Sequence, residues 1–107
     1  MANPYTNKSF DLTTTALTTV YTCPANTTAL VKTIQMTNDS GTVNVEVYLA
    51  DTSASTEVEI AHLTMSARST DNFAYGTIVL EAGDSLKVQA ATGSTVTGVL
   101  SILEIDF

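Results

Sequence analysis

The sequence predicts an all-β protein, a single antiparallel β-sandwich of jelly-roll type with about eight short strands. Apolar and polar residues alternate over short stretches, which is the pattern of a strand with one buried face. Turn-forming clusters separate these stretches along all 107 residues, and no window of helical length carries an apolar stripe with helical spacing. Threonine, at 20 of the 107 residues, adds β-branched side chains that suit a half-exposed sheet.

The alternation is clearest over residues 43–49, where three valines and a leucine are separated by more polar side chains. Val58 and Ile60 repeat it, and His62 continues their parity, so we expect a partly buried, hydrogen-bonded histidine. The other predicted strands are Thr18–Thr22, Ala29–Thr37, Leu63–Ala67, Thr77–Leu80, Ser85–Ala90 and Thr95–Ile105. The predicted turns are residues 24–26, 38–41, 51–53, 71–72, 82–84 and 92–94.

The last predicted strand is apolar on both of its faces. One parity holds Val96, Leu100 and Ile102, and the other holds Val99, Leu103 and Ile105. A strand of a two-layer sandwich needs only one apolar face. The segment is therefore either a central strand covered by a loop or a strand that packs against another subunit, and in the second case Val99, Leu103 and Ile105 are candidate contact residues.

The N-terminal residues are polar apart from the isolated Tyr5 and Phe10. We therefore expect two parts in the chain, a flexible N-terminal arm at residues 1–12 and a β-sandwich domain at residues 13–107. Such an arm either frays, as chain ends do, or lies on a neighbouring subunit. On a neighbour, Tyr5 and Phe10 are the candidate contact residues.

Residues 81–84, Glu-Ala-Gly-Asp, form with Lys87 a close cluster of glycine, acid and lysine. Gly83 supplies a position with positive φ, and Asp84 can accept hydrogen bonds from backbone amides across a turn. We interpret the cluster as the corner between two strands, not as a pair of catalytic carboxylates. Because the sequence has one histidine, His62, and no G-x-S-x-G motif, we assign no catalytic residue and do not expect an enzyme.

The net charge of −7 makes nucleic acid and an anionic membrane unexpected partners. A single cysteine, Cys23, forms no intrachain disulfide, and one cysteine with one histidine makes a zinc site implausible. Oxygen donors at residues 38–41, and at Asp51 with Glu57 or Glu59, leave a weak calcium site open, although their spacing matches no EF-hand. We assign no metal and no cofactor. The start of the sequence has no basic and apolar leader, so we expect no signal peptide.

Two aromatic residues, Phe73 and Tyr75, lie in or beside a predicted loop. Aromatic loop residues are frequent contact anchors, and they equally often plug one end of a sandwich. Together with Tyr48 and Tyr5 they would offer a platform for a sugar, which makes a carbohydrate-binding module a more distant alternative. The lack of tryptophan weakens this alternative.

Two stretches, VYTCPANTTALVKTIQMTN at residues 20–38 and VLEAGDSLKVQAA at residues 79–91, resemble the small β-sandwich virion proteins of tailed bacteriophages, including cyanophages. In that pattern a strand ends in Tyr-x-x-Pro-Ala-Asn, a second closes on Thr-Asn, and a Leu-x-x-Gly-Asp-x-Leu corner precedes a last apolar strand that ends in glutamate. The matching residues are Tyr21, Pro24, Ala25, Asn26, Thr37, Asn38, Leu80, Gly83, Asp84, Leu86 and Glu104.

The resemblance implies a structural protein of the virion, with no catalytic residues to carry over. It implies either a capsid decoration (cement) protein that binds the outer capsid surface and stabilises capsomers, or a tail, baseplate or fibre-attached module. The partner would be the major capsid protein in the first case and tail proteins in the second. The protein would be made in the host cytoplasm. The two-sided last strand and the N-terminal arm add the expectation of a homo-oligomer, with a trimer as one form.

Overall fold

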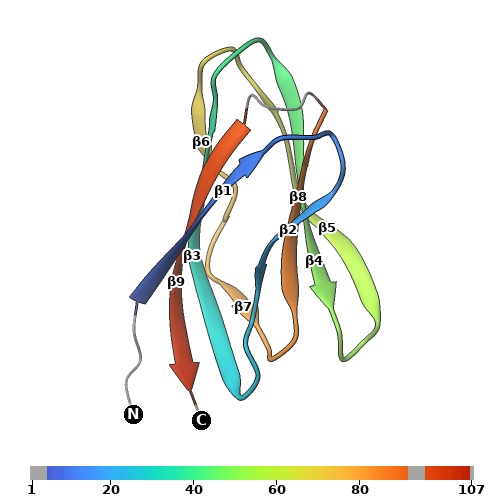
Figure 1. The fold of residues 1–107 in the computed structure, drawn as a ribbon, viewed down its shortest axis with the longest axis vertical. Helices are drawn as coiled ribbons and strands as arrows, with labels where there is room; N and C mark the ends of the chain where they lie inside the picture. Colours follow the sequence, from blue (N-terminus) through green and yellow to red (C-terminus); the bar gives the residue numbers. More distant parts are fainter. Residues whose placement is uncertain (1–4, 92–95, 107) are drawn as a thin grey trace.

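The computed structural model describes residues 5–91 and 96–106, and over these residues the chain forms two antiparallel β-sheets that face each other (Figure 1). The five-stranded sheet contains β1 (Tyr5–Leu12), β9 (Val96–Asp106), β3 (Thr27–Asn38), β6 (Thr70–Asn72) and β7 (Ile78–Leu80), and both short strands pair with β3. The four-stranded sheet contains, in order, β2 (Thr18–Thr22), β8 (Ser85–Ala90), β4 (Val43–Asp51) and β5 (Thr56–Met65). Among the described residues no helix is long and apolar enough to cross a membrane.

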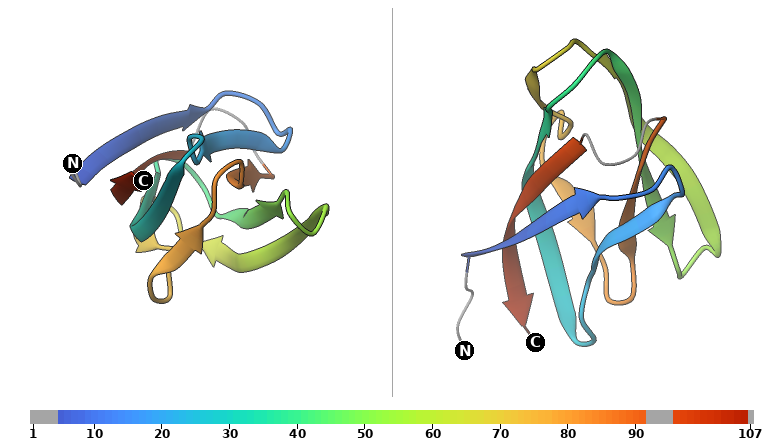
Figure 2. Two further views of the ribbon diagram at one scale, coloured as in Figure 1. Left: turned by 90° about the horizontal axis from the view of Figure 1, so that it is seen from below. Right: turned by 45° about the horizontal axis from the view of Figure 1, so that its top comes forward.

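Strands that are far apart in the sequence lie side by side in both sheets. β1 pairs with β9, β9 with β3, β2 with β8 and β8 with β4, so the chain passes repeatedly from one sheet to the other (Figures 1 and 2). This winding of a double sheet is the jelly-roll arrangement. The predicted all-β jelly-roll sandwich is confirmed.

The core lies between the sheets and is built from the inward parity of each strand. Its largest fully buried side chains are Phe73, Leu12, Ile34, Met36, Met65, Leu80, Leu86, Leu100, Ile102, Val31, Val45 and Val47. Burying side chains of this size contributes about 1.5–3 kcal/mol each, which is what holds a two-layer domain of this length together. Among the described residues the one cysteine, Cys23, is free and buried in this core.

The N-terminal segment differs from the predicted arm. Residues 1–4 of that arm lie outside the described residues, but Tyr5–Leu12 is β1, and it pairs with β9 along its whole length. Leu12 is buried in the core, and the Phe10 ring packs over Gly98, which lies directly opposite it on β9. Over Tyr5–Leu12 the structure therefore has a paired strand where the sequence predicted a flexible arm, because β1 covers the edge that β9 would otherwise expose.

The sequence left two explanations for the two apolar faces of β9: a central strand covered by a loop, or a strand that packs against another subunit. The structure shows the central strand of the first explanation but no covering loop among the described residues. β9 is a central strand, between β1 and β3, and Val96, Leu100 and Ile102 are fully buried in the core. Its other parity is half-buried and points away from the four-stranded sheet. No described segment lies over that side.

The remaining differences are local. The predicted strands on either side of His62 are one strand, β5, and residues 71–72, predicted as a turn, belong to the short strand β6. The predicted turn at residues 92–94 lies outside the described residues.

Candidate functional site

A row of large side chains runs across the outer face of the five-stranded sheet. Backbone register places Tyr5 opposite Leu103, Leu103 opposite Leu30, and Leu30 opposite Val79, so the row crosses β1, β9, β3 and β7. Tyr5 is 74% exposed and Val79 is 54% exposed, while the two leucines between them are half-buried. We call these four residues the apolar row.

The rest of this outer face is mostly small and uncharged, apart from Lys32 and Asp11. Lys32 is the extra residue of the β-bulge between Val31 and Thr33 on β3; it is exposed, and its Nζ lies 3.5 Å from the hydroxyl of Thr77. Ile105 and Val99 lie on either side of the row on β9, and Thr28 and Gln35 are their partners on β3. Other outward residues are Asn7, Ser9, Thr97, Ser101, Thr33 and Thr37. Asp11, at the end of β1, is the one carboxylate among the described outward positions of these paired strands.

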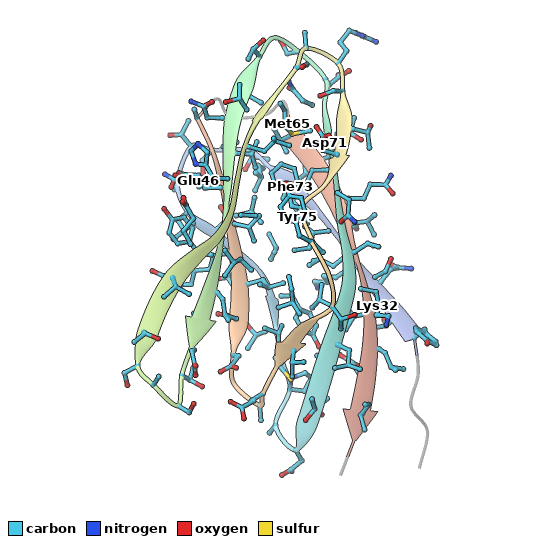
Figure 3. The ribbon with its side chains drawn as sticks, turned by 180° about the vertical axis from the view of Figure 1, so that it is seen from behind. Lys32, Glu46, Met65, Asp71, Phe73 and Tyr75 are labelled. Carbon is cyan, nitrogen blue, oxygen red and sulfur yellow. The ribbon has the colours of Figure 1, made fainter. Side chains whose placement is uncertain are left out.

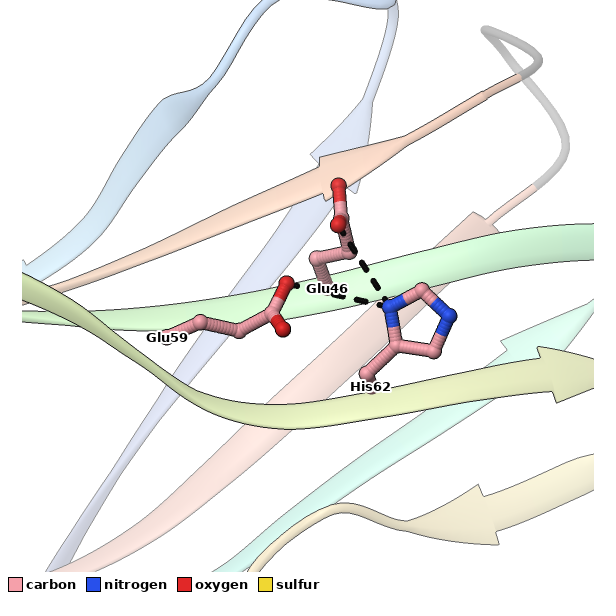
Figure 4. Close-up of side chains that lie close together, drawn as sticks. All are labelled: Glu46, Glu59 and His62. Atoms are coloured by element: carbon pink, nitrogen blue, oxygen red, sulfur yellow. Dashed lines mark ion pairs between the residues drawn. The ribbon is translucent and has the colours of Figure 1, made fainter.

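The outer face of the four-stranded sheet has the opposite character. Lys87 on β8 forms an ion pair of 2.7 Å with Glu57 on β5. Next to them, Nδ1 of His62 lies 3.4 Å from a carboxylate oxygen of Glu46 and 3.7 Å from one of Glu59 (Figure 4). Three carboxylates, a lysine and a histidine thus gather on one sheet face.

A β-bulge brings His62 to this face. The register between β4 and β5 shifts at Val47 and Tyr48, so Ile60 has no direct partner and the parity of β5 reverses after it. His62 therefore lies opposite Glu46 with its side chain 54% exposed. The prediction of a partly buried histidine on the inward parity is wrong, and this one inserted residue is the reason.

The cluster of Glu46, Glu59 and His62 is the described group that most nearly offers a metal site. Its ligand atoms lie within 4.8 Å of one another, and carboxylates with imidazole are zinc ligands. A structural zinc site needs four ligands, however, and the cluster has three, all on an exposed sheet surface. It is an exposed network of ion pairs, a kind that contributes little to stability. Loss of hydration, followed by the charges of Glu46 and Glu59, raises the pKa of the neighbouring Tyr48.

The cluster at residues 81–84 is the corner that the sequence predicted. Asp84 is 3% exposed; one of its oxygens accepts from the backbone N of Thr52 (3.1 Å) and from its hydroxyl (3.2 Å), and the other accepts from the backbone N of Glu81 (3.0 Å). Gly83 has φ +89°. Both oxygens of the Asp84 carboxylate accept hydrogen bonds of the turn, which is the role of a strand corner. Carboxylate oxygens of Asp51, Glu81 and Asp84 lie within 4.8 Å of one another. Asn38, the start of the other calcium candidate, is likewise buried and bonded to Gly41 and Ser66.

The candidate contact residues separate into three groups. Tyr5, Leu103, Ile105 and Val99 lie on the outer face of the five-stranded sheet, where the sequence predicted contacts. Phe10 is half-buried and packs over Gly98, so part of its ring is exposed, whereas Phe73 is 1% exposed and lies in the core. Tyr75 is 73% exposed. Figure 3 shows it close to Phe73, two residues earlier in the chain. Leu30 and Val79 were not predicted as contacts, because only the register across four strands brings them into the row.

The four aromatic residues of the sugar-binding alternative do not form one platform. Phe73 is in the core, as the plug that was the other interpretation of this loop. Tyr5 and Tyr48 lie on the outer faces of different sheets. Tyr75 borders a cavity of about 180 Å³ between β5 and β7, together with Ile60 and Ile78. Sugar rings stack on aromatic faces that share a surface, and that surface is not present.

Comparisons with known proteins find similarity of fold only. No protein-family model matches the chain, and no curated protein matches it. Among solved structures, the chain is similar to a virus-like particle of the extra small virus of the giant freshwater prawn Macrobrachium rosenbergii, with 14% identity and a TM-score of 0.48 over 97% of this chain and 79% of that chain. A pentameric capsid protein isolated from metagenomic phage sequences has 14% identity and a TM-score of 0.45, over 94% and 67% of the two chains. A carbohydrate-binding module in complex with calcium and xylotriose has 16% identity and a TM-score of 0.33, over 95% and 73%. Similarities this low assign no function.

The chain is therefore a jelly-roll β-sandwich with two unlike outer faces: one is crossed by the apolar row and has Lys32 and Asp11 as its charged residues among the described outward positions, and the other carries a cluster of charges. Within the described residues no nucleophile, base and orienting group come together. Among those residues, His62 pairs with carboxylates and with no hydroxyl or thiol.

Proposed function

We propose that the chain is a structural protein of a virus particle, and specifically a capsid decoration protein that binds the outer capsid surface and stabilises capsomers. Its action is binding, not chemistry. The observation that carries the proposal is the outer face of the five-stranded sheet, where an apolar row lies exposed on an otherwise acidic chain. A surface of this kind marks a site of protein contact.

Two further points support the virion. Jelly rolls recur in viral capsid proteins, although a fold alone does not define a function. The stretches at residues 20–38 and 79–91 resemble virion proteins of tailed phages. In the structure the first contains the end of β2 and all of β3, and the second contains the β7–β8 corner, where Asp84 accepts a hydrogen bond from Thr52 just after β4. The partner in this proposal is the major capsid protein. In the alternative form, with tail proteins as partners, the same fold would serve in a tail, baseplate or fibre.

The number of copies per particle tests the proposal. Quantitative mass spectrometry of purified virions, with the major capsid protein as internal standard, gives that number. Hundreds of copies are expected for a decoration protein, and a few dozen or fewer would move the protein to the tail. Absence from purified virions would refute both forms.

A further inference from the structure

We propose that the outer face of the five-stranded sheet is a self-association surface, on which a second copy of the chain packs face to face about a two-fold axis. The inference deepens the proposed structural role by naming a second copy, and not the capsid surface, as what covers this face; the capsid would then be bound through another surface of the dimer. It rests on the proposed function only in assuming an assembling protein. It can be tested on purified protein, so its failure and the failure of the virion proposal are separate results.

The apolar row gives the contact its attractive part. Tyr5 and Val79 are more than half exposed, and Leu103 and Leu30 join them into a continuous strip across four strands. Ile105 adds a further half-buried apolar side chain beside the strip. When a second copy covers these side chains, each Å² of apolar surface removed from water contributes about 25 cal/mol of favourable free energy.

The charge distribution favours this face over the outer face of the four-stranded sheet for a contact between two copies. The chain carries a net charge of −7, so two copies repel each other wherever carboxylates meet. Three carboxylates, of Glu46, Glu57 and Glu59, lie on the four-stranded sheet. Packing sheets are about 10 Å apart, so face-to-face contact of the five-stranded sheets separates the two acidic faces by about 30 Å. The Debye length at physiological ionic strength is about 8 Å, so that repulsion is screened.

The size of the face is close to what a stable pair needs. Each outward residue of a sheet covers about 33 Å², the product of about 4.8 Å between strands and about 6.8 Å between residues on one side. The paired strands β1, β9, β3 and β7 with their neighbour β6 therefore offer on the order of 500 Å² in projection. The accessible surface of this face is larger than its projected area, because side chains such as Tyr5 project from it. A standard interface buries about 800 Å² of accessible surface per partner, which is the value to compare.

The row also suits two-fold symmetry. An isologous contact uses one patch twice. A two-fold axis parallel to the strands, between β9 and β3, places Tyr5 of one copy over Val79 of the other and Leu103 over Leu30. Apolar residues then meet along the whole row, and Asp11, which lies at the end of β1 away from the row, does not face its own equivalent.

Light scattering after gel filtration and sedimentation velocity, across a range of protein concentrations, test the contact. We expect a dimer that Val79→Glu weakens by about 100-fold or more in Kd, because the variant buries an unpaired carboxylate in the interface. Val58→Glu is the matched control, since Val58 is also a strand valine, is 48% exposed, and lies on the four-stranded sheet. Leu103→Glu should act as Val79→Glu does, and circular dichroism shows whether each variant is folded.

A cross-link tests the geometry. Tyr5 and Val79 lie three strand spacings apart in one chain, about 14 Å, which is too far for an intrachain disulfide. Packed sheets are about 10 Å apart, which is also too far for a disulfide between copies, so the test uses a thiol-reactive cross-linker that spans about 10 Å. This reagent should join the double variant Tyr5→Cys/Val79→Cys into a dimer, while it should not join Tyr5→Cys/Val58→Cys. Cys23 is 1% exposed and does not compete.

Three results would overturn the inference: a monomer at all concentrations, a dimer that Val79→Glu and Val58→Glu weaken equally, or equal cross-linking of the two double variants. A monomer found on virions would leave the virion proposal intact. A dimer in solution, with the protein absent from purified virions, would support the self-association surface and refute the virion proposal.

Discussion

Replacing Asp84 by alanine tests whether the corner between β7 and β8 joins the two sheets. Its carboxylate accepts hydrogen bonds from the backbone N of Thr52 (3.1 Å), at the end of β4, and from the backbone N of Glu81 (3.0 Å), just after β7. Thr52 also donates its hydroxyl to the carboxylate at 3.2 Å. One buried side chain thus ties a turn of the four-stranded sheet to a strand of the five-stranded sheet.

The expected cost follows from the groups that lose their acceptor. Asp84→Ala leaves two backbone N–H groups without a partner in a part-buried corner, and each costs about 1–3 kcal/mol. We therefore expect the free energy of unfolding to fall by about 3 kcal/mol. For a domain whose total stability is about 5–15 kcal/mol, that is a large fraction. Asp84→Asn should lose less, because its carbonyl can still accept from Thr52 while its amide faces the N–H of Glu81.

Urea unfolding followed by circular dichroism measures the effect. With a slope of about 2 kcal/mol/M, the midpoint should fall by about 1.5 M. Asp51→Ala is the matched control, because Asp51 also accepts hydrogen bonds within a turn, from Ser53 (2.8 Å) and Ala54 (3.3 Å), but at an exposed one. We expect it to cost less than about 1 kcal/mol. Equal losses for the two alanine variants would refute this account of the corner.

Three further outcomes are expected. Gly98→Ala should lower the free energy of unfolding by about 1–3 kcal/mol, because a Cβ there meets the Phe10 ring (2.8 Å) and a backbone oxygen (2.9 Å); thermal unfolding measures it, and no loss would contradict the close packing. Burial, then the hydrogen bond and charge of Glu104, raises the pKa of Tyr21. An unfolded tyrosine has a pKa of about 10, so above that pH the unfolded chain loses the Tyr21 proton before the folded chain does, and the free energy of unfolding should fall. Urea titrations between pH 9 and 11 measure this fall, which should be smaller in Tyr21→Phe. Burial likewise raises the pKa of the Cys23 thiol, so alkylation should require unfolding, and fast labelling of the native protein would contradict its burial.

The sheets and the corner could be predicted from the sequence because their signals are local. Alternation over residues 43–49 marks β4 whatever its partners are, and Gly83 with Asp84 marks a turn. The strand β1 was not predicted, because it lacks such a local signal. Its residues Tyr5–Leu12 have few apolar side chains on either parity, so its strand conformation comes from pairing with β9 and not from its own pattern.

The candidate surfaces depend on register, which a sequence does not display. His62 was placed on the wrong face because the bulge at Ile60 shifts β5 by one residue, and such a shift moves every later side chain to the other side. The apolar row has the same origin. Tyr5 and Leu103 stood out singly, but Leu30 and Val79 become part of one surface only when four strands from distant parts of the chain are aligned.

The separation of charge and apolar surface also predicts how salt affects self-association. If the second copy packs on the five-stranded sheet, the acidic faces of the two copies lie about 30 Å apart and repel each other only weakly, so added salt has little repulsion to screen. The Kd should then change by less than about threefold between 50 mM and 500 mM sodium chloride. Association through the four-stranded sheet would instead bring Glu46, Glu57 and Glu59 of both copies together, so salt would strengthen it markedly. Sedimentation velocity at the two salt concentrations distinguishes these arrangements. A strong gain in affinity at high salt would place the contact on the four-stranded sheet and contradict the proposed one.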